Sequence, residues 1–367
     1  MNGLLIASLT SGSKKNIGDY IQSVAQEQYW DHIDCYVERE KLASFTTSSD
    51  EKVNVIMQGW FMWNADEFPP ADCINPYFIS FHLQPYVADK LLSSSRSVEY
   101  LKKYEPIGCR DLRTKELLEA KGIKCWFSGC LTLTLGMNYI SPVKDDKVYI
   151  VDPYFEVGGS KTFSYPKRAL IVLKECIVHL RQVLKLKTKY TAIKKYAHGL
   201  KGWALSMADA ASLYHTYSKF FTDEILLGAE YLTHIIDVSG MSEDEKMDYA
   251  RRLIRKYASA KLVISSRIHA VLPAMAVKTP AIFMNSDFLQ NKASTGIPAG
   301  RFGGLINLLN CITIDNPALS STSIKRLLAK GKIGMDSQIT NPTEYESVAE
   351  DLKAHTYLFV NKCKWGG

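Results

Sequence analysis

The sequence has little of what marks a secreted, zinc-binding or membrane-spanning protein. Its eight cysteines are scattered without a CxxC pair, so neither a disulfide framework nor a cysteine zinc site is indicated. No run of about 18 uncharged apolar residues occurs, and the apolar start lacks both a preceding basic region and a small-residue cleavage site. We therefore expect a cytoplasmic chain with no signal peptide, no membrane span and no bound metal.

Glycine-rich nucleotide signatures are missing as well. Neither GxGxxG nor a Walker sequence is present, and the loop TSGSKKN after the first apolar run resembles a phosphate loop only in its small residues. Short-period repeats and low-complexity tracts are absent, while 46% apolar and 23% charged residues are typical of a globular protein. A length of 367 residues exceeds what one core usually organises, so we expect two domains.

What the chain does contain is an alternation of short apolar runs and helical segments, which predicts parallel sheets with right-handed crossovers. A polar stretch near residue 145 divides the pattern into two halves. We predict a first domain at 1–145, a second at 146–342, and a final helix at 343–367 that packs back toward the first domain. Strands are predicted at 2–9, 53–59, 77–82, 106–109 and 123–127, and then at 148–154, 233–238, 261–266, 280–284 and 311–314.

The positive charge is concentrated in one segment. Residues 161–201 hold eleven Lys or Arg against one acid, Glu175, so this segment carries +10 while the rest of the +7 chain carries −3. We interpret residues 165–220 as a helical insertion in the second domain. A nucleic-acid partner is disfavoured because no binding motif accompanies the basic residues. An apolar stripe favours an anionic membrane surface, and a plain solvated helix face stays open as the alternative.

The most informative segment is KLVISSRIHAVLPAMAVKTPAIFM at 261–284, where an apolar strand runs directly into Arg267 and His269. Ligands of open α/β sheets bind at the carboxyl ends of the strands. Arg267 offers a planar fork for a carboxylate or phosphate, and His269 can move a proton near neutral pH. The alternative is a surface arginine beside a histidine that caps a helix.

Other candidates follow strands in the first half or precede helices. Arg110 ends the run PIGC and is a second candidate anion ligand, and Arg301 in GRFGGL is a third. Asn16 and Asp19 at a helix start suit hydroxyl binding, and Asp19 can also accept a proton. Aromatic and imidazole groups that could face a sugar are Trp60, His82 and His234, each with a purely structural alternative.

Four segments together resemble the polysaccharide pyruvyl transferase family, including its bacterial capsule-synthesis members. The strongest is 257–284, which contains Arg267 and His269; the others are NIGDYIQ, residues 104–135 and GRFGGL. The resemblance implies two Rossmann-like domains facing a cleft, similar to the glycosyltransferase-B fold. It also implies phosphoenolpyruvate as donor, bound mainly by Arg267 and His269, with no further cofactor.

On this resemblance, His269 protonates the methylene carbon of phosphoenolpyruvate and Asp19 takes the proton of the attacking hydroxyl. The product would be a pyruvate ketal on a sugar of a surface polysaccharide repeat unit. We expect that acceptor to be linked to polyprenyl diphosphate, which would bring the enzyme to the inner membrane face. Two alternatives remain open: a glycosyltransferase that uses a nucleotide sugar, and a non-catalytic scaffold of capsule assembly.

Overall fold

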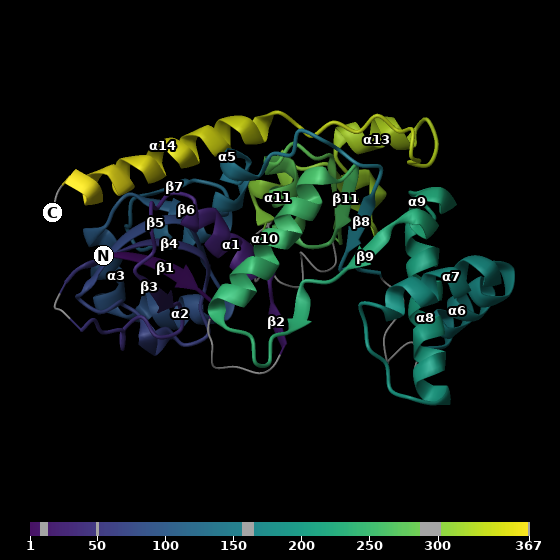
Figure 1. The fold of residues 1–367 in the computed structure, drawn as a ribbon, viewed down its shortest axis with the longest axis horizontal. Helices are drawn as coiled ribbons and strands as arrows, with labels where there is room; N and C mark the ends of the chain where they lie inside the picture. Colours follow the sequence, from purple (N-terminus) through teal and green to yellow (C-terminus); the bar gives the residue numbers. More distant parts are fainter. Residues whose placement is uncertain (8–13, 49–50, 156–164, 287–301, 366–367) are drawn as a thin grey trace.

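The protein is an α/β structure with two parallel sheets, consistent with two Rossmann-like domains (Figure 1). The structure is a computed structural model that describes residues 1–7, 14–48, 51–155, 165–286 and 302–365. Helices cover the faces of both sheets, and the two chain termini lie at the same end of the molecule. The predicted fold class of two parallel α/β sheets is confirmed.

The first sheet consists of β1 (Asn2–Ile6), β3 (Cys35–Glu38), β4 (Val53–Phe61), β5 (Ile74–Leu83), β6 (Ile107–Cys109) and β7 (Cys125–Phe127). Among the described residues these six strands are all parallel, in the order β3-β1-β4-β5-β6-β7. The chain therefore reverses direction across the sheet between β1 and β4. Such a switch point opens a crevice at the carboxyl ends of the two strands.

The second sheet repeats this arrangement with β8 (Val148–Val151), β9 (Glu230–Leu232), β11 (Leu262–Ser265), β12 (Ala281–Asn285) and β13 (Cys311–Thr313). The order is β13-β12-β11-β8-β9, again with every described neighbour parallel. Its switch point lies between β8 and β11. Fully buried strands such as β8 and β11 read in the sequence as continuous apolar runs, because both of their faces are covered.

A small antiparallel pair joins the two halves. It is formed by β2 (Lys14–Asn16) and β10 (Ile235–Asp237), with Asn16 opposite Ile235. The next backbone N–H, that of Ile17, donates to the carbonyl oxygen of His234 at 2.7 Å. This bond ties the start of the first helix, α1 (Gly18–Glu27), to the second half of the chain. The segment from β2 to the start of α1 is thereby held against residues that are more than 200 positions away.

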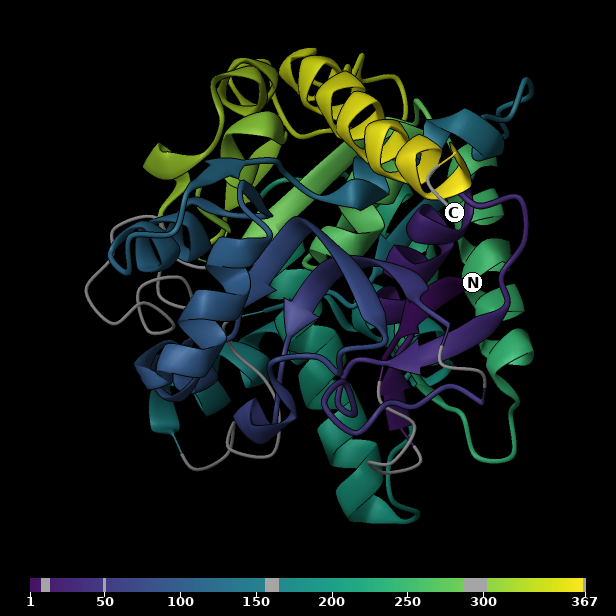
Figure 2. The ribbon, with the colours of Figure 1, turned by 90° about the vertical axis from the view of Figure 1, so that its left-hand side faces the viewer.

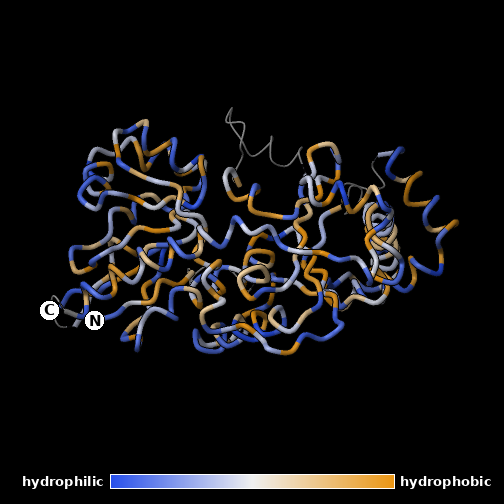
Figure 3. Tube along the Cα trace, turned by 90° about the horizontal axis from the view of Figure 1, so that it is seen from above, coloured by the Kyte–Doolittle hydropathy of each residue, from blue (hydrophilic) through white to orange (hydrophobic). Residues whose placement is uncertain are grey.

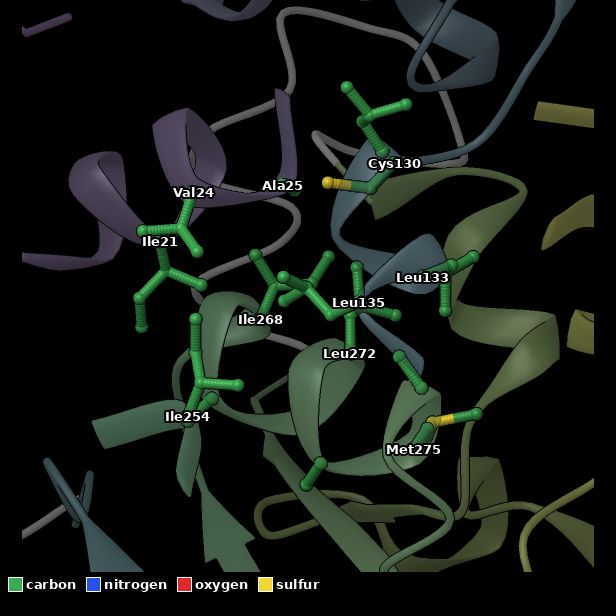
Figure 4. Packing of buried hydrophobic residues seen from close by; sticks show 14 of the residues in the cluster. Ile21, Val24, Ala25, Cys130, Leu133, Leu135, Ile254, Ile268, Leu272 and Met275 are labelled. Carbon is green, nitrogen blue, oxygen red and sulfur yellow. The ribbon is translucent and has the colours of Figure 1, made fainter. Parts of the chain in front are cut away.

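Helix α1 also lies in a core that both halves share. It packs against α10 (Glu243–Ser259) and α11 (Ile268–Ala276), and η2 (Leu131–Thr134) packs against α1 and α11. Figure 4 shows Ile21 and Val24 of α1 close to Ile254 of α10 and Leu272 of α11, and all four side chains are fully buried. Because the same apolar groups bury both halves, the core fixes how the two sheets face each other.

The predicted insertion is a bundle of α6 (Pro166–Val178), α7 (Leu180–Thr191) and α8 (Leu200–Tyr217). These helices stand between β8 and β9 in the chain and project at the end of the molecule away from the termini (Figure 1). Helix α8 packs against both other helices. Its core side, with Leu213 among others, joins Leu186 of α7 and Ile150 of β8 in one buried cluster. The bundle is therefore anchored to the second sheet.

The last helix, α14 (Glu344–Trp365), crosses above the first sheet (Figure 2). Its Phe359 ring stacks on Tyr77 of β5 with centroids 4.9 Å apart, and His355 lies against Trp126 of β7 at 4.7 Å. Within the described part of the chain, none of the helices is long and apolar enough to cross a bilayer. The remaining helical segments are α2 (Pro85–Ser93), α3 (Ser95–Lys103), α4 (Leu112–Glu119), α5 (Gly136–Tyr139), α9 (Asp223–Gly228), α13 (Thr322–Leu328), η1 (Ala65–Glu67), η5 (Leu305–Leu308) and η6 (Pro317–Leu319).

Four of the described strands differ from the sequence prediction: β10 pairs elsewhere than predicted, and β2, β3 and β9 were not predicted. The run at 233–238 was predicted to belong to the main sheet, but its strand β10 pairs with β2, and the short β9 just before it takes the edge position in the second sheet. Strand β3 was not predicted at all. It is four residues long and only partly buried, so it lacks the continuous apolar run that marks the inner strands.

Candidate functional site

A cavity of about 870 Å³ lies where the carboxyl ends of the two sheets face each other. Residues at or just after the ends of β2, β3, β4, β5 and β6 line it on one side, and residues that follow β8 and β11 line it on the other. Both switch points therefore open into the same space, the position that the topology of open α/β sheets favours for a ligand. Its size suits a ligand larger than a single three-carbon anion.

On the second sheet's side, Arg267 is held by Asp152. Asp152 directly follows β8, and its Oδ2 accepts hydrogen bonds from Arg267 Nε at 3.1 Å and from the His234 backbone N–H at 3.0 Å. Its Oδ1 accepts from the Thr233 hydroxyl at 2.7 Å. The Arg267 side chain is 41% exposed, and its terminal nitrogens bind no residue that the structure describes. The guanidinium is thus oriented through Nε while its outer edge is available to an anion.

His269 lies two residues further, in the first turn of α11, and is 7% exposed. Its Nδ1 is 3.5 Å from Gln22 Nε2, and the same amide nitrogen is 3.3 Å from Asp19 Oδ1. If the amide donates to both, Nδ1 is an acceptor and the imidazole carries its proton on Nε2. The Gln22 side chain packs directly against Gly59. Gly59 has a φ of +90°, and a Cβ added there would lie 2.5 Å from Gln22 Oε1.

His234 forms part of the cavity wall but has its ring buried. Its Nε2 contacts the Tyr257 hydroxyl at 2.7 Å, while Nδ1 has no hydrogen-bond partner among the described residues. Burial lowers the pKa of His234 to about 4; the nearby Asp152 opposes this shift and Arg267 adds to it. The imidazole is therefore neutral near pH 7.

Arg110 approaches the cavity from the first sheet, where it follows β6 and is 2% exposed. Its Nε is 3.9 Å from Oδ2 of Asp111, the residue that caps α4 by accepting from the Thr114 N–H. His82 Nδ1 contacts the same Oδ2 at 2.5 Å. Burial by itself would raise the pKa of Asp111, but His82, Arg110 and the bond from Thr114 hold that pKa below its usual value. A buried carboxylate thus supports the buried guanidinium.

The wall near α1 is polar and aromatic. Asp19 Oδ2 lies 3.7 Å from a terminal nitrogen of Arg39, and the Arg39 guanidinium lies over the Trp60 ring at 4.9 Å. Trp60 and Trp63 are neighbours with centroids 4.7 Å apart, and Trp63 is 62% exposed. An exposed ring beside a carboxylate suits a sugar, because the ring stacks on the apolar sugar face while the carboxylate binds hydroxyls.

The structure brings most of the predicted site residues together. The cavity is lined by Asn16, Asp19, Trp60, Arg110, His234, Arg267 and His269. His82 is not part of the wall that the described residues form; it lies behind Arg110, buried against Asp111. Arg301 lies outside the described residues.

The sequence analysis did not identify several other residues that line the cavity, although the sequence carries a signal for two of them. Asp152 and Arg39 each follow a strand directly, which is the pattern that singled out Arg267. Arg39 was missed because β3 was not recognised as a strand. Tyr190 comes from the insertion. It is far along the chain from every predicted site residue, so nothing in the sequence indicated that it lines the cavity. The remaining missed residues include Gln84, Tyr154 and Asn285.

The site therefore combines cations from both halves with an imidazole and a carboxylate. Arg267 and Arg110 enter the cavity from opposite sheets, and Arg267 directly precedes α11, whose helix dipole favours a bound anion. His269 and Asp19, joined through Gln22, offer a proton donor and a proton acceptor. This arrangement suits group transfer from a small polyanion to a hydroxyl.

Comparison with known protein families agrees with this chemistry. A family model described as polysaccharide pyruvyl transferase matches residues 90–287, more than half of the chain. The matched part includes Arg110, His234, Arg267 and His269, whereas the wall around Asp19 precedes it. A search of curated proteins finds no match. The resemblance that the sequence predicted is confirmed.

The buried His234 predicts a pH-dependent stability. Its pKa is about 4 when folded, against an ordinary 6.5, so the unfolded chain binds more protons between these values. As pH falls from 6.5 to 4, His234 should lower the free energy of unfolding by about 3 kcal/mol. In His234→Gln this contribution should be absent, which urea denaturation of both proteins at pH 4.5 and 7 would measure. Equal pH dependence in the two proteins would contradict the prediction.

Proposed function

Because the chain belongs to the polysaccharide pyruvyl transferase family, we propose that it transfers the pyruvyl group of phosphoenolpyruvate to a sugar of a surface polysaccharide repeat unit. Two hydroxyls of the sugar become bridged by a pyruvate ketal, and inorganic phosphate is released. We assign the two sheets to domains at 1–145 and 146–342, arranged as in the glycosyltransferase-B fold, with α14 of the final segment 343–367 packed back on the first domain. The observation that carries the proposal is the Asp152-oriented Arg267 beside His269 in a cavity at both switch points.

The donor fits the cationic side of the cavity. Phosphoenolpyruvate carries a planar carboxylate and a tetrahedral phosphate, and guanidinium groups bind both kinds of oxyanion well. We assign one oxyanion to the free edge of Arg267 and the N-terminus of α11, and the other to Arg110. Since Arg110 is almost fully buried, its charge acts in a site with little water, where electrostatic stabilisation is strongest.

His269 is the acid in this proposal. As the imidazolium, His269 transfers its Nε2 proton to the methylene carbon of the donor, the double-bond electrons form the new C–H bond, and the ring is left as a neutral imidazole. The adjacent carbon then carries positive charge, which the first sugar hydroxyl attacks as Asp19 takes the hydroxyl proton. Phosphate leaves with the electrons of its C–O bond, and the second hydroxyl attacks the same carbon and closes the ketal. The second hydroxyl gives its proton to the neutral imidazole of His269, which restores the acid, and the proton held by Asp19 passes to the released phosphate.

The acceptor occupies the wall around α1. Asn16 and Asp19 bind hydroxyls, Trp60 with its neighbour Trp63 stacks on the sugar ring, and His234 offers a neutral imidazole at the back of the site. We place a sugar linked to polyprenyl diphosphate here, because repeat units of surface glycans are built on such carriers. Apart from His234, these groups precede the residues that the family model matches.

The donor assignment predicts ligand-induced stabilisation. Millimolar phosphoenolpyruvate should raise the melting temperature of the wild type by at least about 2 °C, because only the native state binds it. In Arg267→Ala most of this shift should be lost, measured against that variant's own melting temperature without ligand. The control is Arg96→Ala, an exposed arginine on α3, which should keep the full shift. A nucleotide diphosphate that stabilises the wild type when phosphoenolpyruvate does not would favour a nucleotide-sugar glycosyltransferase instead.

The acid assignment predicts a separation of binding from turnover. His269→Gln should lower the rate of phosphate release from phosphoenolpyruvate, with the lipid-linked glycan fraction as acceptor, by about 10²–10⁴-fold. The melting shift with phosphoenolpyruvate should survive, since Arg267 and Arg110 are intact. His32→Gln, an exposed histidine, serves as the matched control. Turnover of His269→Gln close to wild type would remove His269 from the mechanism.

A further inference from the structure

The insertion carries an apolar face that nothing in the described chain covers. On α6 the side chains of Leu170, Leu173 and Ile177 are 67%, 57% and 70% exposed, and their i, i+3, i+7 spacing puts them on one side of the helix. On α7, Leu180 and Leu184 add a second exposed pair at i, i+4 spacing. Figure 3 shows hydrophobic and hydrophilic residues alternating along this outer end of the molecule. A contiguous exposed patch of this kind marks an interaction surface.

This lack of cover is not a defect of the bundle's own packing. The opposite faces of the same helices bury Val172 of α6 and Val183 with Leu186 of α7 against α8 and the second sheet. Each helix thus carries two apolar stripes. The inner stripe is buried in the bundle, and the outer stripe faces solvent. The outer stripe needs a separate explanation.

Unpaired positive charge borders the outer stripe. Lys174 on α6 and Arg181 and Lys185 on α7 are exposed, and none forms an ion pair with a residue that the structure describes. By contrast, Lys189 and Lys194 point inward, where Lys189 donates to the Ala229 carbonyl at 2.9 Å and Lys194 pairs with Asp209. Part of the positive charge of the segment, carried by Lys174, Arg181 and Lys185, therefore lies beside the apolar face.

The segment's acid does not neutralise this border. Glu175 is 7% exposed and its Oε1 contacts His215 Nδ1 of α8 at 2.9 Å, on the inner side of α6. The outer side thus combines large aliphatic groups with basic residues and has no carboxylate of its own from α6 or α7. This is the composition of a helix that lies in the interface of an anionic bilayer.

We infer that the outer face of α6 and α7 docks the protein on an anionic lipid surface. The leucines and isoleucine enter the boundary of the acyl chains, and Lys174, Arg181 and Lys185 contact the lipid phosphates. A second copy of the chain fits less well, because a two-fold contact through this face brings the same unpaired cations together. Docking on lipid goes beyond the proposed function. It rests on that function only for the reason why docking would be useful.

That purpose is access to a lipid-linked acceptor. Tyr190, near the end of α7, lines the cavity, and Leu180 begins the same helix ten positions earlier, roughly 15 Å away along the axis. One rigid helix thus connects the docking face to the site. A bilayer bound at Leu180 and Leu184 would hold the carrier lipid of the acceptor close to the cavity.

The test is sedimentation of the full chain with phosphatidylcholine vesicles, with and without phosphatidylglycerol. The wild type should bind the anionic vesicles at least tenfold more tightly than the neutral ones. Two triple variants should each lose at least about tenfold of that affinity. They are Lys174→Glu with Arg181→Glu and Lys185→Glu, and Leu170→Ser with Leu173→Ser and Ile177→Ser.

Matched controls change the same chemistry elsewhere. Lys325→Glu with Arg326→Glu and Lys330→Glu alters exposed cations around α13, and Val143→Ser with Leu319→Ser and Leu358→Ser removes exposed apolar groups. Both controls should bind vesicles like the wild type. Equal losses in test and control variants would overturn the inference in favour of general charge attraction. A wild-type dimer that the leucine variant converts to a monomer, with vesicle binding unchanged, would overturn it in favour of a second copy.

The phosphoenolpyruvate melting shift, measured on every variant, separates this inference from the proposed function. An unchanged shift in the triple variants shows that the fold and the donor site are intact, so that a loss of vesicle binding reports the docking face alone. Vesicle binding by a wild type that phosphoenolpyruvate does not stabilise would support the docking face while refuting the donor.

Discussion

The geometry of the site depends on the carboxylate of Asp152. This residue sits at φ +42° immediately after β8, at the switch point of the second sheet, and holds Arg267 and the backbone of His234 with the same oxygen. The carbonyl of His234 in turn accepts the N–H of Ile17, where the first half of the chain enters α1. One carboxylate therefore orients Arg267, the candidate ligand of the donor. It also holds the His234 backbone, whose contact with Ile17 places the candidate acceptor wall opposite Arg267.

The shared core makes this alignment stable. Side chains of α1, α10 and α11 pack into one cluster, so the two sheets cannot separate without exposing it to water. The first turn of α11 holds His269 and the first turn of α1 holds Asp19, and Gln22 lies between them. The groups that we assign to proton transfer thus stand on helices that the core itself positions, which is the arrangement that a preorganised site requires.

Much of this was predictable where the chemistry is local. Buried strands such as β4 and β11 are apolar runs, and Arg267 stands out because an arginine after such a run has no packing reason to be there. The sequence could not reveal that β10 leaves the main sheet to pair with β2, because that choice depends on a partner more than 200 residues away. The same holds for Tyr190, which reaches the cavity only through the packing of α7, and for His82, whose contact with Asp111 is set by the order of β5 and β6.

In the proposed reaction, one anionic donor lies between Arg267 of the second sheet and Arg110 of the first. A crystal structure of the protein soaked with phosphoenolpyruvate tests it most directly. We expect density with one oxyanion on the outer edge of the Arg267 guanidinium, the other on Arg110, and the methylene carbon facing His269. Density elsewhere in the cavity, with both arginines unoccupied, would contradict it.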